Sequence, residues 1–116
     1  MTVASHILAR ELKDNAAQIH SMYLPEAESD VSEKEEQLPL LQARAAQAQA
    51  EFERCRKLLE SDNAALHEYE RAVQSLVYAE DHLSCLIHSL DLAKRKLAFW
   101  THRYNDLTSR AAKLGA

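Results

Sequence analysis

Apolar side chains recur at intervals of three and four residues along most of the chain, which is the spacing of one face of an α-helix. Near the amino terminus the apolar stripe contains Leu8, Leu12, Ala16, Ile19 and Tyr23. This pattern predicts a helix over about residues 5–23, with Ser5 as the residue that caps its start.

The segment 24–31 is predicted to be a linker, because Pro25 lacks the N–H group that would continue the first helix. Ser32 followed by Glu35 has the spacing of a capping box, so a second helix is expected over about residues 32–60. Pro39 then falls within the first turns of this helix. Either the helix kinks there, or Pro39 is its first residue.

From Leu38 onward the stripe becomes a heptad repeat with Leu38 at position a, and apolar residues occupy positions a and d. In the second half of the chain position g is apolar as well. The residues at this third position are Leu58, Ala65, Ala72, Ala79, Leu86, Ala93, Trp100, Leu107 and Leu114. A stripe three positions wide can pack against more than one helix, which favours a bundle over a two-stranded coiled coil.

The residues Ser-Asp-Asn at 61–63 prefer caps and turns, so they predict the turn of a helical hairpin. Such a turn pairs residues whose numbers add to about 125, which sets the acidic segment 26–36 beside the basic Lys-Arg-Lys at 94–96. The alternative is one continuous helix, which leaves both charged segments unpaired within the chain. The hairpin is therefore the preferred prediction.

A third helix is expected over about residues 64–114, and its last turns extend beyond the hairpin partner. A break near 80–84, which would make four helices, is the alternative; the repeat continues in phase there, and this favours one helix. The chain contains one glycine, Gly115, and is rich in strong helix formers. The predicted fold is all-α: a long helical hairpin with an additional N-terminal helix, resembling a three-helix bundle, in a single domain 1–116.

Composition narrows the classes of function. The formal net charge of -4 does not favour nucleic acid or an anionic membrane as a partner. No apolar run approaches the roughly 18 to 20 residues that span a bilayer, and the first residues lack the features of a signal peptide. A cytoplasmic protein with reduced Cys55 and Cys85 is expected.

His82, Cys85 and His88 lie at three-residue intervals and are the candidate metal ligands. On the heptad they occupy the face opposite the core, and the two histidines lie about 9 Å apart along a helix axis. Both imidazoles would have to bend toward the middle to share one ion. A solvated or partner-facing surface is therefore preferred, and no metal site is assigned.

Sequence features of an enzyme are absent. There is no glycine-rich phosphate loop, and pairs such as Glu35 with Glu36 are consecutive residues, which do not face each other on a helix. Cys55 occupies position d, where a thiol acts as a small apolar side chain. We therefore expect no enzymatic activity, no cofactor and no small-molecule substrate.

The carboxyl-terminal quarter is basic and contains aromatic residues, which makes nucleic acid an alternative partner. Its cations are Lys94, Arg95, Lys96, Arg103, Arg110 and Lys113. Cations at the end of a helix also arise simply because they complement the helix dipole. A protein partner is therefore preferred over nucleic acid.

The preferred function is protein binding through the apolar stripe of the long third helix, as in adaptors, inhibitors and secretion chaperones. The partner is another protein or a second copy of the chain. Large apolar groups supply most binding energy when they are buried, and they single out five candidate anchors. These are Leu90, Phe99, Trp100, Tyr104 and Leu107.

Overall fold

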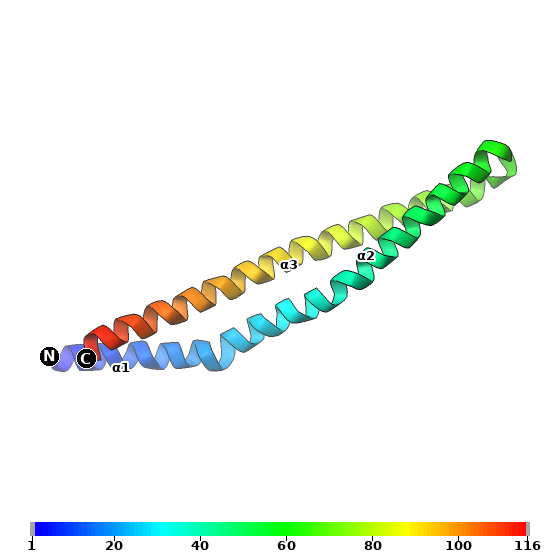
Figure 1. Ribbon diagram of the computed structural model, residues 1–116. Helices are drawn as coiled ribbons and strands as arrows, with labels where there is room; N and C mark the ends of the chain where they lie inside the picture. The colour runs from blue at the N-terminus through cyan, green and yellow to red at the C-terminus, as the bar shows by residue number, and fades with distance from the viewer. Residues whose placement is uncertain (1, 116) are drawn as a thin grey trace. The chain divides into compact units, whose positions relative to one another are not determined.

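The computed structural model describes residues 2–115, and this part of the chain holds helices and no strand. The elements follow one another as α1 (Val3–Gln18), the π-helical turn η1 (Ile19–Tyr23), α2 (Leu24–Ser61), the short 3₁₀ turn η2 (Asn63–Ala65) and α3 (Leu66–Gly115) (Figure 1). The predicted all-α class and the helical hairpin are confirmed.

Contacts between residues divide the chain into two compact units, where the sequence predicts a single domain. The hairpin unit is Glu33–Leu90, and the terminal unit joins Met1–Ser32 with Asp91–Ala116. Both α2 and α3 contribute residues to each unit.

The hairpin unit reverses direction at Asp62, inside the predicted turn. Asp62 has an extended backbone, with φ -149° and ψ 109°, and its carboxylate accepts a hydrogen bond from the Ala64 N–H at 2.9 Å. The Asp62 N–H and the Ser61 hydroxyl both donate to the Leu58 carbonyl, at 2.9 and 3.1 Å. These bonds satisfy backbone groups that have no partner inside a helix. The alternative of one continuous helix is therefore wrong.

The core of the hairpin unit is a seam between α2 and α3. From α2 the seam takes positions a and d, as predicted, and Leu41 and Cys55 are its buried members. Across the seam the ring of Phe52 meets that of Tyr69, with centroids 5.7 Å apart. From α3 the seam takes positions d and g, and the residues at these positions are buried or half-buried: Ala65, Tyr69, Ala72, Leu76, Ala79, Leu83, Leu86 and Leu90.

The positions of α3 that face α2 differ from the predicted ones. The predicted heptad repeat places position a in the seam, whereas positions d and g occupy it. Position a includes Glu80 and becomes polar at Lys94, whereas positions d and g stay free of charged residues from Ala65 to Leu114. Burying d and g therefore avoids placing a charge in the seam, which would be costly without a partner. Position a is left at the edge of the seam, where Val73 is half-buried.

The terminal unit is built by α1, η1 and the start of α2 against the last part of α3. Its core is a cluster of Ala16, Ile19 and Leu107, against which Leu12, Leu24, Trp100 and Tyr104 pack. Two ring contacts join η1 to α3, one between His20 and Tyr104 at 5.6 Å and one between Tyr23 and Trp100 at 4.6 Å.

The predicted linker 24–31 is wrong, because α2 begins at Leu24 and is helical through this segment. The Leu24 N–H bonds to the carbonyl of Ile19, five residues earlier, which is the bond of a π-helix. In a regular helix the ring of Pro25 would clash with the carbonyl four residues before it, and the wider π turn relieves that clash.

The helix boundaries at 23 and 32 are corrected for the same reason. Ser32 and Glu35 lie inside α2, so they form no capping box, and Pro39 is an exposed residue within α2 rather than its start. At the first helix the cap is Thr2 instead of Ser5: the Thr2 hydroxyl accepts a hydrogen bond from the Ser5 N–H at 3.1 Å. The third helix is unbroken from Leu66 to Gly115, so the alternative break near 80–84 is wrong.

Candidate protein-interaction surface

Three of the five predicted anchors are used by the core of the terminal unit. Leu107 is only 3% exposed and belongs to the buried cluster with Ala16 and Ile19. Trp100 and Tyr104 are half-buried against the same cluster. The N-terminal helix and η1 therefore cover most of the stripe that the sequence leaves for a partner.

The other two anchors have opposite environments. Leu90 is buried at the end of the hairpin unit. Phe99 is 58% exposed and lies edge-on to the neighbouring Trp100 ring, with centroids 5.0 Å apart. Of the predicted anchors, Phe99 alone presents most of its side chain to solvent.

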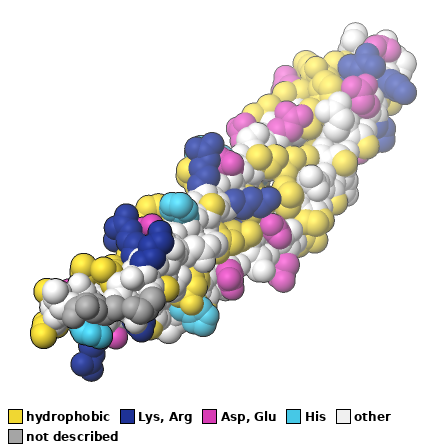
Figure 2. Space-filling model, turned by 60° about the vertical axis from the view of Figure 1, so that its left-hand side comes forward, with side chains coloured by type: hydrophobic (Ala, Val, Ile, Leu, Met, Phe, Trp, Pro, Cys, Tyr) yellow, Lys and Arg dark blue, Asp and Glu magenta, His cyan; other side chains and the backbone are white. Residues whose placement is uncertain are grey.

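The hairpin unit carries a different apolar surface, which we call the outer row of α3 and define as Leu66, Val73, Val77 and Ile87. Leu66, Val73 and Ile87 occupy heptad position a, at multiples of seven residues, and Val77 occupies the adjacent position e. Leu66, Val77 and Ile87 are 50%, 52% and 50% exposed, and Val73 is half-buried. Because position a lies next to position d on the helix, this row flanks the seam that positions d and g form with α2. Exposed hydrophobic side chains are also visible in the space-filling view (Figure 2).

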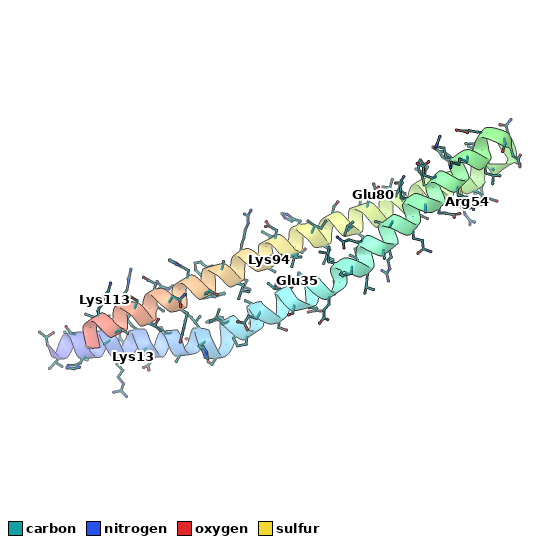
Figure 3. The ribbon with its side chains drawn as sticks, viewed as in Figure 1. Lys13, Glu35, Arg54, Glu80, Lys94 and Lys113 are labelled. Atoms are coloured by element: carbon teal, nitrogen blue, oxygen red, sulfur yellow. The ribbon has the colours of Figure 1, made fainter. Side chains whose placement is uncertain are left out.

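The charges that α3 itself places around the outer row have one sign. Glu80 lies in the same row as Val73 and Ile87, Glu70 lies in the row of Val77, and Asp81 follows on the outward side. The heptad positions a, b and e of α3 between residues 66 and 88 contain no Lys or Arg. Glu80 is labelled on α3 in Figure 3. Among the described residues, these three carboxylates have no ion-pair partner, so the surface is apolar and acidic.

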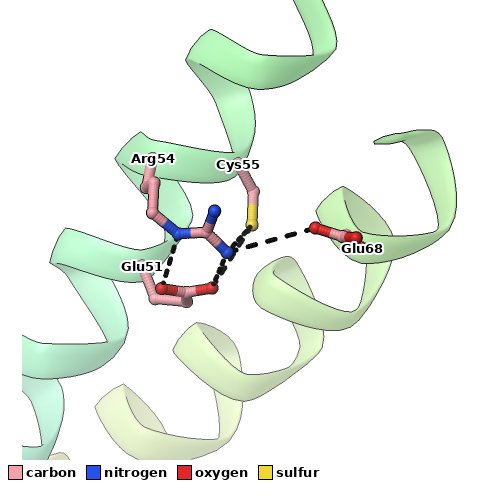
Figure 4. Close-up of polar contacts among 4 residues, drawn as sticks. All are labelled: Glu51, Arg54, Cys55 and Glu68. Carbon is pink, nitrogen blue, oxygen red and sulfur yellow. Dashed lines mark hydrogen bonds and ion pairs between the residues drawn. The ribbon is translucent and has the colours of Figure 1, made fainter. Parts of the chain in front are cut away.

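The opposite flank of the hairpin unit is polar. It holds an open cavity of about 430 Å³ lined by Glu51, Arg54, Cys55, Glu68, Arg71, Ala72 and Ser75. The Arg54 guanidinium donates from Nε to Glu51 at 3.0 Å and lies 4.0 Å from Glu68 on α3 (Figures 3 and 4). These contacts fix Arg54 between two helices.

The polar cluster also includes a buried thiol (Figure 4). Cys55 is 1% exposed and its Sγ lies 3.6 Å from Glu51 Oε1, to which it donates. Burial, together with this hydrogen bond, raises the pKa of the Cys55 thiol, whereas the hydrogen bond from Arg54 lowers the pKa of the Glu51 carboxyl. A shielded thiol with a raised pKa is a poor nucleophile.

His82, Cys85 and His88 are all exposed on α3, and His82 lines an open pocket with Leu41 and Arg44 of α2, at the edge of the seam and not opposite the core. The ring of His82 contacts that of Tyr78, with centroids 6.0 Å apart. Within residues 2–115 no group of three His, Cys, Asp or Glu side chains is placed to hold a metal ion.

The basic end of α3 carries its own counter-charges. Arg95 pairs with Asp91 at 3.1 Å, and Asp106 pairs with Arg110 at 3.3 Å and with Arg103 at 3.9 Å. Pairing within one helix reduces the charge that is available to a phosphate backbone. The structure therefore adds no support to the nucleic-acid alternative.

The outer row could be recognised in part from the sequence. Leu66, Val73 and Ile87 occupy position a, one of the three apolar positions that make the stripe unusually wide, whereas Val77 at position e lies outside them. The heptad pattern alone does not show which two of the positions a, d and g of the third helix contact the second helix. The signal that decides it is the uninterrupted apolar character of positions d and g.

None of the described helices is both long and apolar enough to cross a membrane. No family model matches the sequence, no curated protein matches it, and no solved structure matches the fold. The chain's function therefore has to be inferred from its own surfaces, and the outer row of α3 is the candidate site.

Proposed function

We propose that the protein is a non-enzymatic helical module that binds another protein through the exposed apolar surface of α3. The observation that carries this proposal is the outer row, in which Leu66, Val77 and Ile87 each keep about half of their side chain exposed. Isolated exposed leucines are common, but a heptad-spaced row on one helix face is the pattern that receives another helix. Adaptors, inhibitors and chaperone-like proteins are the classes of function that such a surface serves.

The area that the chain exposes supports this proposal. The accessible surface is 8348 Å² for a chain of 13.2 kDa. The scaling law for folded monomers gives about 6,400 Å² at this mass. The difference exceeds the roughly 800 Å² that each partner buries in an interface of standard size. The chain therefore has enough uncovered surface for a specific partner.

The energetics of the outer row are also adequate for binding. Full burial of a Val, Leu or Ile side chain contributes about 1.5–3 kcal/mol, so covering the exposed half of each contributes roughly 1 kcal/mol. Leu66, Val73 and Val77 lie within about three helical turns of one another, and Ile87 lies beyond Glu80 in the same row. The carboxylates supply the polar groups that interfaces also require. Phe99, which belongs to the terminal unit, is a separate exposed group and is not needed for this surface.

Site-specific photocrosslinking in the native cell tests the proposal. A photoreactive residue replaces Val73 or Ile87 in the outer row, and in the matched control it replaces Ser75, which lines the polar cavity on the other flank. We expect discrete protein adducts from positions 73 and 87 and none from position 75.

A second variant separates binding from folding. Ile87→Asn should leave the free energy of unfolding within about 0.5–1 kcal/mol of the parent, because the side chain is half exposed. The same variant should remove the adducts formed from position 73. Equal adducts from all three positions, or adducts that persist in Ile87→Asn, would contradict the proposal.

A further inference from the structure

We propose that the outer row receives a single amphipathic helix whose apolar stripe is flanked by lysine and arginine. This inference rests on the proposed function and adds the chemistry of the partner. It follows from the shape of the row, from the sign of the charges around it, and from the poor fit of a second copy of the chain.

The shape of the row fits a helix. Leu66 and Ile87 lie on the same face of α3, and at the rise of an α-helix the row between them is about 32 Å long. A partner helix of about six turns, with apolar residues every three or four positions, would contact the whole row. The helix that carries the row is unbroken and has no proline or glycine between residues 66 and 87, so the surface is already formed, with Glu80 standing between Val73 and Ile87.

The charges indicate the sign of the partner. Glu70, Glu80 and Asp81 surround the apolar side chains, and among the described residues none of them has an ion-pair partner. A partner that brought carboxylates to this surface would add repulsion in a partly desolvated setting, where charges interact more strongly than in water. Lysine or arginine at the flanking positions would instead complete three ion pairs and would speed association.

A second copy of the chain fits less well. In an antiparallel pairing of two outer rows, Leu66 meets Ile87 of the copy, and the heptad then sets Val73 against Glu80 of the copy. A parallel pairing sets Glu80 against Glu80. Either arrangement places three carboxylates from each copy in one interface without a cation, which opposes self-association.

Two synthetic peptides of about 24 residues provide the direct test, since they share one apolar stripe and differ only in Lys or Glu at the flanking positions. Binding to the full chain is measured by fluorescence anisotropy at low and high salt. We expect the Lys peptide to bind at least about tenfold more tightly than the Glu peptide, and we expect this ratio to shrink at high salt as the charges are screened.

Variants of the chain assign the binding to the outer row. Ile87→Asn should weaken the Lys peptide about tenfold or more, and the double variant Glu80→Gln with Asp81→Asn should remove most of the preference for Lys over Glu. The double variant Glu26→Gln with Glu28→Gln, two exposed changes in the terminal unit, is the control for net charge and should change neither quantity.

The outcomes separate this inference from the proposed function. Equal affinity for the two peptides would overturn the charge assignment, while adducts at positions 73 and 87 would still uphold protein binding. A dimer in light scattering that Ile87→Asn dissociates would show that the occupant is a second copy, and it would overturn the inference. Failure of both peptide binding and crosslinking would remove the inference and the proposed function together.

Discussion

The ring of Tyr23 lies flat against the indole of Trp100, with centroids 4.6 Å apart and planes 9° from parallel. Tyr23 belongs to η1 and Trp100 to α3, so the stack joins two segments of the terminal unit that are far apart in the sequence. The neighbouring Phe99 faces solvent instead. Two adjacent aromatic residues therefore have different roles, one in packing and one at the surface.

Replacement of Trp100 should cost stability. Full burial of a tryptophan makes its loss to alanine cost about 3–5 kcal/mol, and since Trp100 is half-buried we expect about 2–3 kcal/mol. Phe99→Ala is the matched control and should cost less than about 1 kcal/mol. Urea denaturation followed by circular dichroism measures both. Equal losses in the two variants would mean that the stack does not hold the terminal unit together.

The sequence was sufficient to predict the hairpin but not the start of α2. The turn at 61–63 is local chemistry, because short polar side chains there satisfy the backbone at the helix end. The segment 24–31 is helical in spite of Pro25, because η1 adds one residue to the repeat and lets the stripe of α1 continue into α2. The core residues Ile19 and Leu24 are five positions apart. A pattern of intervals of three and four instead continues from Ile19 to Tyr23, so it does not reveal this spacing.

A deletion tests the extra residue in η1. Removing Ser21, which is exposed, shortens the spacing between Ile19 and Leu24 to four, the interval of a regular helix. Because Pro25 would clash with a backbone carbonyl in that regular helix, the deletion is combined with Pro25→Ala, and we then expect the π turn to become α-helical with helicity and melting temperature retained or raised. Circular dichroism and differential scanning calorimetry give these two quantities.

The control for this deletion removes His102, an exposed residue of α3. At this point α3 is a regular α-helix with no extra residue. The deletion therefore rotates every later side chain by about 100° about the helix axis, and Leu107 leaves the core. The variant should lose much of the cooperative unfolding of the terminal unit. If the two deletions had the same effect, η1 would not be the site of the extra residue.

The two cysteines should differ sharply in reactivity. Cys55 is buried with a raised pKa, whereas Cys85 is exposed on α3. Because the thiolate is the reactive form, a colorimetric thiol reagent should label one thiol rapidly in the native protein and the second only after unfolding. Cys85→Ser should abolish the rapid phase and leave the slow one. A rapid phase that survived in Cys85→Ser would show that Cys55 is accessible.

Acid should remove the contribution of Glu51. Its pKa is lowered from 4.5 in the folded state by the hydrogen bond from Arg54, so its contribution is present above pH 4.5 and is lost as the pH falls through the folded-state pKa. The difference in free energy of unfolding between the parent and Glu51→Gln should be constant near neutral pH and should shrink below pH 4.5. In an Arg54→Ala background, which lacks the hydrogen-bond donor, this trend should disappear. A difference that stayed constant down to pH 2 would mean that the Arg54 contact does not operate in solution.

The candidate surface was only partly accessible to sequence analysis. Large apolar side chains such as Trp100 and Leu107 are the natural choice for a partner contact, but the same properties suit them to the core of the terminal unit. The smaller residues Val73 and Val77 attract less notice. Their role becomes visible only once the structure shows which side of α3 faces α2.

The division into units has a consequence for the order of folding. The terminal unit is assembled from two segments separated by the whole of Glu33–Leu90. Joining the ends of such a long flexible loop costs about 3–4 kcal/mol of chain entropy, whereas the tight bend at Asp62 brings its flanking helices together at small cost. Folding should therefore begin at the bend and spread outward, and a nascent chain should hold Tyr23 unstacked until its last helix has been synthesised.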